Sequence, residues 1–305
     1  MDLVATFGFV LLMLALGRAL AWKGLLTDAA PPVINTIVLF VCLPAAILRH
    51  APSLEFEPAL IGVIAVPWLI LAVGVVAILG LAKLLDLGRP VTAALLMLAT
   101  LGNTSFLGFS VIPGLAGAGA LRYAVIYDQF GSFLQLSTFG VIVLAVHGGE
   151  QRPRAAEIAK RVLGFPPFLV LVLAVTVMPS SYPPLIEEGL ARLEGALLPL
   201  VALAIGVQLR LRVAREHVLP LGIGLIAKLI VAPALALGFC LALGLEGDMR
   251  AACVFEAAMP SMITAGALLA GAGLAGELAA GLVGVGILAS MVTLPCWWWV
   301  LSLVG

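Results

Sequence analysis

The sequence predicts an all-α integral membrane protein, and three observations lead to this prediction. Of the 305 residues, 63% are hydrophobic and only 10% are charged, and the mean hydropathy is +1.22. A soluble domain carries roughly 25% charged residues, so this surface suits lipid better than water. A membrane-spanning helix needs about 20 apolar residues, so ten spans with short loops account for the whole chain.

Ten apolar runs, separated by charges, proline pairs and glycine clusters, define the expected spans in chain order. The first five cover about 3–22, 31–48, 58–84, 90–113 and 120–147, and the second five about 164–179, 189–209, 216–243, 249–271 and 276–303. A hydrophilic stretch, 148–161, lies between the two groups. The first run follows Asp2 and not a basic segment, so we expect a retained helix and not a cleaved signal.

The basic residues predict the orientation. With the N-terminus outside, the outer ends of the spans hold four of them, Arg49, Arg122, Arg192 and Arg250. The inner ends and loops then hold eleven: Arg18, Lys23, Lys83, Arg89, Arg152, Arg154, Lys160, Arg161, Arg210, Arg212 and Arg215. Because lysine and arginine favour the cytoplasmic side, we expect both termini outside the cytoplasm of a cell (inner) membrane.

Short matching segments in the two halves of the sequence indicate an internal repeat. Leu43-Pro44 matches Leu198-Pro199 at an offset of 155, and the Ala-Gly-Ala-Gly of 116–119 matches that of 270–273 at an offset of 154. Five helices are an odd number, so the second copy enters the membrane upside down, as in many secondary transporters. We therefore expect repeats at 1–147 and 164–305, joined by a cytoplasmic loop at 148–163.

Two expected spans contain helix-breaking residues at matching places in the two halves. The fourth contains Gly102-Asn103-Thr104-Ser105, and the ninth contains Pro260-Ser261 followed by Thr264. Glycine and proline weaken a helix, while hydroxyls and an amide satisfy the backbone groups that a break sets free. Half-helix N-termini favour anions and C-terminal carbonyls favour cations, so the pair marks a candidate transport site. The alternative is two ordinary kinks in packed helices.

Four residues within the expected spans add charge or polarity that lipid disfavours. Glu256 lies one turn before Pro260, Asp128 and Gln129 follow Tyr127 in the fifth span, and Lys228 lies in the eighth. The two carboxylates could bind Na⁺ or take up a proton. Lys228 either attracts an anionic substrate or forms a structural ion pair with one of the acids.

Other classes of function lack support. The formal net charge is zero, so nothing draws the chain towards nucleic acid. The four cysteines lie in apolar stretches without metal-ligand spacing. No zinc-protease, nucleotide-phosphate or dinucleotide motif is present, so we expect no enzyme and no cofactor apart from a candidate Na⁺.

On these motifs, over nearly its whole length, the chain resembles the auxin efflux carrier family of permeases. The resemblance rests on Leu43-Pro44-Ala45, the segment 102–108, Tyr127-Asp128-Gln129, the segment 228–233 and Ala258-Met259-Pro260-Ser261. The asparagine-containing segment 102–108 is the most specific of them. The short central stretch resembles that of bacterial members and not that of the plant carriers with long cytosolic loops.

The resemblance implies the fold shared with bile acid sodium symporters. That fold has two inverted five-helix repeats, a scaffold bundle and a transport bundle, with helices four and nine crossing at their breaks. It implies that Asn103 is a substrate or ion ligand, that Pro260 marks the second crossing, that Glu256 helps to hold sodium, and that Asp128 approaches that site. Many members have an asparagine where this chain has Thr264, so substrate recognition is expected to differ there.

The expected function is secondary-active transport of a small organic anion of the carboxylate class, coupled to Na⁺ or H⁺. An uncoupled, potential-driven facilitator or channel is the alternative, and a membrane receptor is less favoured because no signalling domain is attached. Membrane lipid is an expected partner, and a homodimer stays open. The candidate substrate-binding residues are Asn103, Thr104, Ser105, Tyr127, Gln129, Lys228, Pro260, Ser261 and Thr264, and the candidate ion-coupling residues are Asp128, Glu256 and Asn103.

Overall fold

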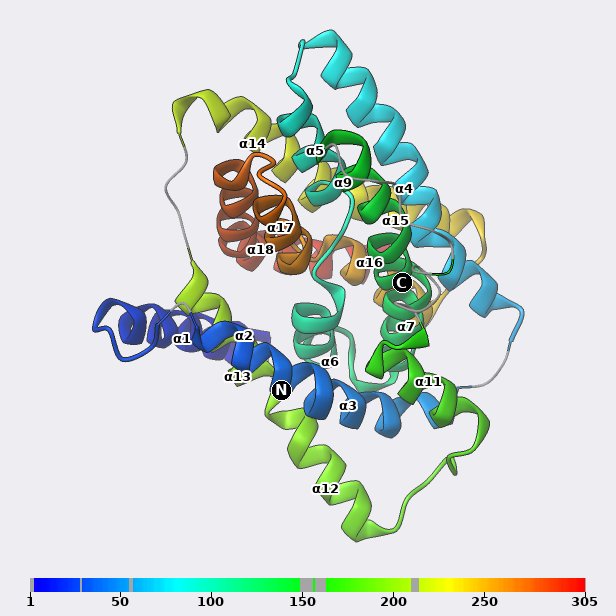
Figure 1. The fold of residues 1–305 in the computed structure, drawn as a ribbon. Helices are drawn as coiled ribbons and strands as arrows, with labels where there is room; N and C mark the ends of the chain where they lie inside the picture. Colours follow the sequence, from blue (N-terminus) through cyan, green and yellow to red (C-terminus); the bar gives the residue numbers. More distant parts are fainter. Residues whose placement is uncertain are drawn as a thin grey trace. The chain divides into compact units, whose positions relative to one another are not determined.

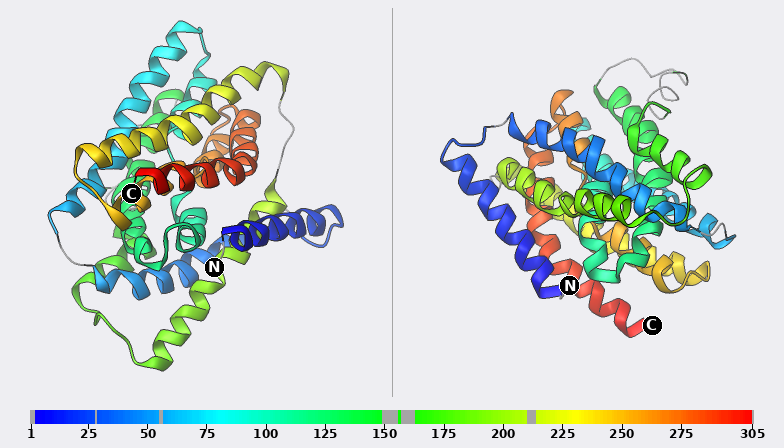
Figure 2. Two further views of the ribbon diagram at one scale, coloured as in Figure 1. Left: turned by 180° about the vertical axis from the view of Figure 1, so that it is seen from behind. Right: turned by 90° about the horizontal axis from the view of Figure 1, so that it is seen from below.

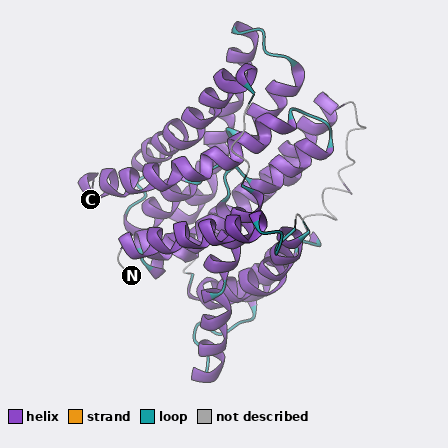
Figure 3. Ribbon diagram, turned by 90° about the vertical axis from the view of Figure 1, so that its left-hand side faces the viewer, coloured by secondary structure: helices purple, strands orange, loops and turns teal. Residues whose placement is uncertain are grey.

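The structure, a computed structural model, describes residues 3–27, 29–54, 57–148, 156, 163–209 and 214–304. These residues are helical almost throughout and contain no strand (Figure 3). Within them, six helices are long and apolar enough to cross a membrane: Ala30–Ser53, Ala59–Leu84, Ala118–Gly148, Pro184–Gln208, Arg215–Ala242 and Gly276–Val304. Four shorter apolar helices are Gly8–Trp22, Arg89–Leu98, Thr104–Ala116 and Pro166–Thr176. The predicted all-α, multi-pass membrane protein is confirmed.

The chain divides into two compact units, and each draws on both halves of the sequence. Unit 1 comprises Met1–Glu57, Ser105–Val125 and Leu163–Leu209, and unit 2 comprises Pro58–Thr104, Ile126–Val162 and Arg210–Gly305. The predicted connecting loop, 148–163, lies almost wholly outside the described residues. So do six of the basic residues behind the predicted orientation: Arg152, Arg154, Lys160, Arg161, Arg210 and Arg212.

In unit 1 the helix α1 (Leu3–Trp22) packs along α13 (Leu197–Gln208) through glycines (Figure 1). A methyl group on Gly17 would lie 2.3 Å from the carbonyl oxygen of Leu203, and one on Gly206 would lie 2.2 Å from that of Leu14. Small residues let transmembrane helices approach this closely. The remaining elements of the unit are α2 (Ala30–Ile37), η1 (Val38–Cys42), α3 (Leu43–His50), η2 (Ala51–Ser53), α6 (Phe109–Ala116), most of α7 (Ala118–Tyr127), α11 (Pro166–Thr176) and α12 (Pro184–Gly195).

The helix expected at about 189–209 begins earlier, at the Pro184 start of α12, so Glu187 and Glu188 lie on this helix and not in the loop before it. The Arg49 guanidinium donates hydrogen bonds to Glu187 at 2.6 Å and to Glu194 at 3.0 Å. His50 Nε2 lies 3.1 Å from both carboxylate oxygens of Glu194. These pairs join α3 to α12, so the acids are compatible with a helix there.

Unit 2 is built on a long helix, α4 (Ala59–Leu84), and on α18 (Gly276–Val304), which lies beside α14 (Val218–Ile226) and η7 (Ala227–Val231) (Figure 2). Leucines and alanines of α5 (Arg89–Leu98) and α18 form much of its apolar core. Thr104, the first residue of η3 (Thr104–Gly108), also belongs to unit 2, whereas the rest of η3 belongs to unit 1. The other elements of unit 2 are η4 (Asp128–Ser132), α8 (Phe133–Gln135), η5 (Leu136–Gly140), α9 (Val141–Gly148), α15 (Ala232–Ala242), α16 (Gly247–Ala258) and α17 (Ile263–Gly271).

The glycine contact between α1 and α13 generates a stability prediction. We expect Gly17→Ala and Gly206→Ala each to destabilise the purified protein by about 1–3 kcal/mol, because the added methyl would collide with backbone and not with a movable side chain. The melting temperature in detergent checks this. Gly8→Ala, on the same helix with nothing within 4 Å of its added methyl, is the matched control. Equal melting temperatures for all three variants would contradict the contact.

Candidate functional site

Two helices are interrupted where the sequence predicts, and both breaks lie in unit 2. The first break, residues 99–103, follows the end of α5 at Leu98, and the second break, residues 259–262, separates α16 from α17. Each break leaves terminal backbone carbonyls or N–H groups without helical partners. In a membrane protein such groups must find partners inside the protein, because lipid supplies none.

The two breaks satisfy each other. Gly102 faces Ser261 in an antiparallel backbone pairing. The Asn103 N–H donates to the Pro260 carbonyl at 2.8 Å, and the Met262 N–H donates to the Leu101 carbonyl at 3.1 Å. The Ser261 hydroxyl adds a bond of 2.7 Å to the carbonyl of Leu98, the last residue of α5. Two segments far apart in the sequence thus form one junction, which we call the crossover.

Lys228 extends into the crossover from η7, a π-helical turn. Its side chain is only 2% exposed, and its Nζ donates to the Ala257 carbonyl at 2.6 Å. Ala257 belongs to the last turn of α16, where the helix dipole is negative and the carbonyls lack helical donors. The hydrogen bond that the structure shows for this ammonium therefore goes to a helix C-terminus and not to either of the predicted acids.

Gly102 makes room for this ammonium. A methyl group at Gly102 would lie 3.1 Å from Lys228 Nζ, 3.2 Å from Lys228 Cε and 3.3 Å from the Glu256 carbonyl oxygen. Such distances are tighter than ordinary van der Waals contact, and one of the three atoms belongs to the backbone. The glycine is thus needed for close approach at the first break.

Asp128 is held by two donors. The Thr104 hydroxyl donates to Asp128 Oδ1 at 2.5 Å, and Gln129 Nε2 donates to Asp128 Oδ2 at 2.6 Å. All three side chains are at most 1% exposed. Thr104 directly follows the first break, so this network connects the crossover to η4, a turn within the fifth predicted span.

Several buried polar atoms beside this network have no hydrogen-bond partner among the described residues. They are both carboxylate oxygens of Glu256, Asn103 Nδ2 and Gln129 Oε1. Buried polar atoms in folded proteins are nearly always hydrogen-bonded, so these atoms call for partners from outside the chain, such as water, an ion or a solute. One donor, an amide N–H₂, and acceptors from a carboxylate and an amide are therefore available around the crossover.

The other predicted site residues occupy different surroundings. Tyr127 is buried and directly precedes η4, and Pro260 is buried and contributes its carbonyl to the crossover. Ser105 is half-buried and belongs to unit 1. Thr264 is exposed on the first turn of α17, so its hydroxyl is not among the buried polar groups of the crossover.

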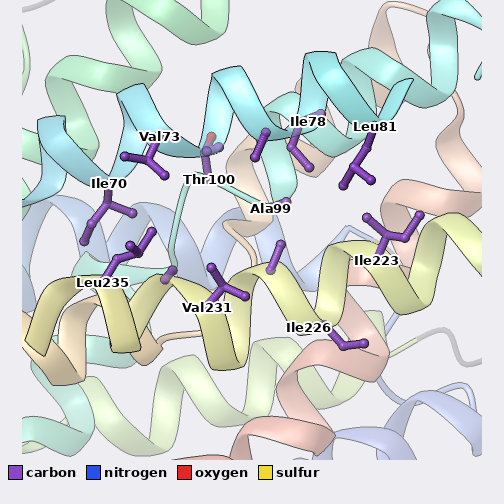
Figure 4. Close-up of a pocket in the computed structure, with 14 residues that line it drawn as sticks. Ile70, Val73, Ile78, Leu81, Ala99, Thr100, Ile223, Ile226, Val231 and Leu235 are labelled. Atoms are coloured by element: carbon purple, nitrogen blue, oxygen red, sulfur yellow. The ribbon is translucent and has the colours of Figure 1, made fainter. Parts of the chain in front are cut away.

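A cavity of about 270 Å³ in unit 2 lies between α4 and the helices α14 and α15 (Figure 4). Ala99 and Thr100, at the start of the first break, line one side of it. Thr100 is its one polar residue, and the hydroxyl of Thr100 donates to the Leu96 carbonyl at 2.5 Å. The cavity therefore suits hydrocarbon and does not extend the polar site.

The sequence marks Gly102 only as a helix-breaking residue, and it gives no indication that Trp297 contacts the site. In the structure Trp297 Nε1 donates to the Leu229 carbonyl at 2.9 Å, next to Lys228, and Trp68 Nε1 donates to the Phe130 carbonyl at 2.9 Å. Pro233, four residues after Leu229, is the only signal in the sequence that this carbonyl needs an outside donor.

Paired helix breaks that hold buried polar side chains are typical of secondary transporters. The comparisons with known proteins likewise indicate a membrane transport protein and not an enzyme. The profile of the family described as "Membrane transport protein" matches residues 3–298, and the chain belongs to this family, the auxin efflux carrier-like permeases. An uncharacterized transporter of Methanothermobacter thermautotrophicus is 27% identical over 94% of this chain and 95% of its own length. The uncharacterized transporter MJ1031 of Methanocaldococcus jannaschii is 25% identical over 99% of this chain and 98% of its own.

The close approach at Gly102 generates the second prediction. We expect Gly102→Ala to lower the melting temperature, because the methyl would push against Lys228 Nζ and the Glu256 carbonyl. The loss should be smaller in a Lys228→Ala background, where one of the two obstacles is gone, so the two changes are non-additive. Gly286→Ala, whose methyl would meet only ordinary contacts of 3.4 Å or more, is the matched control. Strictly additive effects would show that Gly102 and Lys228 do not interact.

Proposed function

We propose that this protein is a secondary-active carrier of a small organic anion of the carboxylate class. The observation that carries the proposal is the crossover, where two broken helices pair and leave buried polar atoms of Asn103 and Glu256 without partners. Paired broken helices are a common way to hold a small charged solute at membrane depth. An uncoupled anion facilitator or channel using the same site is the alternative.

The proposal includes the topology. Ten crossings in two inverted five-helix repeats, 1–147 and 164–305, would put breaks at equivalent places in the fourth and ninth helices. The observed breaks at 99–103 and 259–262 support this arrangement. We place both termini outside the cytoplasm of the inner membrane, on the distribution of basic residues. Movement of one bundle of helices would then expose the crossover to alternate sides.

We assign recognition of the carboxylate to Asn103. Its amide N–H₂ is the unpartnered buried donor at the crossover, and the ammonium of Lys228 adds positive charge beside Gly102. A carboxylate accepts hydrogen bonds and is stabilised by a nearby cation, so both features favour an anion. The remaining proposed lining residues, all of unit 2, are Thr104, Tyr127, Gln129, Pro260 and Ser261.

We assign the coupling cation or proton to Glu256, with Asp128 as the second acid. Both oxygens of Glu256 lack hydrogen-bond donors among the described residues, whereas Asp128 already accepts bonds from Thr104 and Gln129. Carboxylate and backbone carbonyl oxygens are the ligands that a hard cation such as Na⁺ requires, so the residues present fit sodium. A proton bound to Glu256 would neutralise the same buried charge. Sodium coupling and proton coupling are therefore distinguished by experiment.

The assignment of Asn103 makes the third prediction. Purified protein is screened against lactate, malate and indole-3-acetate by melting temperature, and carboxylates that stabilise it are then tested for uptake into proteoliposomes. Asn103→Ala should abolish uptake while keeping the wild-type melting temperature to within about 3 °C. Asn35→Ala, on α2 in unit 1, is the matched control and should transport normally. Uptake retained by Asn103→Ala would contradict this site, and no response of the wild type to any carboxylate would contradict the substrate class.

The role of Glu256 makes the fourth prediction. With Na⁺ and pH gradients imposed separately, one of them should accelerate wild-type uptake, and Glu256→Gln should remove that acceleration. Stimulation by Na⁺ alone identifies sodium coupling, and stimulation by the proton gradient alone identifies proton coupling. Uptake that ignores both gradients and follows only the membrane potential would overturn coupling and favour the facilitator.

A further inference from the structure

Two ionisable side chains of the proposed site lie on π-helical turns. Asp128 begins η4 (Asp128–Ser132), where the Phe133 N–H reaches back five residues to the Asp128 carbonyl. Lys228 lies in η7 (Ala227–Val231), where the Ala232 N–H reaches back five residues to the Ala227 carbonyl. Single π-helical turns are uncommon and are frequent at functional sites, because they rotate side chains relative to a regular α-helix.

The turn that carries Lys228 has a backbone carbonyl without its usual donor. In an α-helix the Leu229 carbonyl would accept from residue 233, which is proline and has no N–H. The indole of Trp297, on α18, supplies the missing donor at 2.9 Å. The bond falls on the residue directly after Lys228, so it anchors the backbone from which the lysine side chain extends to Ala257.

The turn that carries Asp128 has a corresponding anchor. The indole of Trp68, on α4, donates to the Phe130 carbonyl at 2.9 Å. The neighbouring Pro67 packs so closely on Gly131 that a methyl group there would lie 2.5 Å from Pro67 Cγ. Both turns are therefore fixed from outside by a tryptophan on an adjacent helix of unit 2.

We propose that Trp297 and Trp68 are positioning residues of the transport site, whose indole N–H groups hold the two π-helical turns and so place Lys228 and Asp128 at the crossover. The transport part of this inference rests on the proposed function, and the structural part does not. Trp297 acts through Lys228: its indole bonds the backbone of η7, and η7 delivers the ammonium to the C-terminal end of α16.

Trp297→Phe tests the bond, because it keeps an aromatic ring and removes the N–H. Trp298→Phe and Trp299→Phe, at exposed neighbouring positions of the same helix, are the matched controls. We expect Trp297→Phe to lower the melting temperature by about 3 °C, the effect of roughly one buried hydrogen bond in a chain of this size, and the controls to melt as the wild type. A Trp297→Phe melting temperature equal to that of the controls would overturn the anchor, whatever the protein transports.

Pro233→Ala separates positioning from stability. Alanine restores the N–H that an α-helix would offer to the Leu229 carbonyl, so it should return at least half of the melting temperature lost in Trp297→Phe. It should also favour an ordinary α-helical turn and misdirect Lys228. The Trp297→Phe/Pro233→Ala double variant should therefore melt closer to the wild type and still take up the carboxylate roughly fivefold more slowly. Uptake that recovers together with the melting temperature would overturn the positioning role.

The last experiment measures uptake in the Lys228→Met background, again in proteoliposomes and with the carboxylate identified for the wild type. If Trp297 acts through Lys228, Trp297→Phe should slow uptake in the wild-type background and have no further effect once Lys228 is replaced. Likewise, Trp68→Phe should slow uptake in the wild-type background and have no further effect in the Asp128→Asn variant. Additive effects in both pairs would overturn the proposal. Failure of the wild type to transport any carboxylate would count against the proposed function, while the melting measurements would still decide the anchor.

Discussion

The mutual hydrogen bonding of two helix breaks is the interaction on which the rest of this structure depends. At membrane depth no water can satisfy a broken helix, so each break needs a partner inside the protein. Here the partner is the other break, through Asn103 with Pro260 and Met262 with Leu101. That pairing brings the ends of α5 and α16 together, and with them the residues that carry charge. Without it, Glu256 and Lys228 would be isolated ionisable groups in an apolar bundle, which is costly.

The buried charges at the crossover divide into two kinds. Lys228 and Asp128 are each tied by hydrogen bonds to the protein, the lysine to a helix C-terminus and the aspartate to Thr104 and Gln129. Glu256 and the amide of Asn103 keep buried atoms without partners among the described residues. Side chains of the first kind can set a fixed electrostatic background, while those of the second can exchange ligands. The proposed carrier function requires both kinds, because the solute must bind and leave.

The sequence predicted the helices well where apolar runs end at prolines, glycines or charges, as at Pro31, Trp22 and Leu84. It misplaced the start of α12, because Glu187 looks like a loop residue until Arg49 is seen to pair with it. Pairs so distant in the chain leave no periodic trace. The division into two units, each with segments from both halves, is likewise a property of contacts and not of local pattern.

At the candidate site, the sequence by itself marked which residues to consider: a proline, an amide, two acids and a lysine within apolar runs single out Pro260, Asn103, Asp128, Glu256 and Lys228, because such residues weaken a helix or are costly in lipid. It also determined the class of protein, because composition dictates lipid as the solvent. Only the tertiary structure decided which group meets which. Lys228 donates a hydrogen bond to a backbone carbonyl, Thr264 lies exposed, and Gly102 and Trp297 make contacts that the sequence did not reveal. The reason is physical. The free-energy cost of burying a polar group depends on its local sequence and can be inferred from it, whereas the partner of that group is determined by packing between segments far apart in the chain.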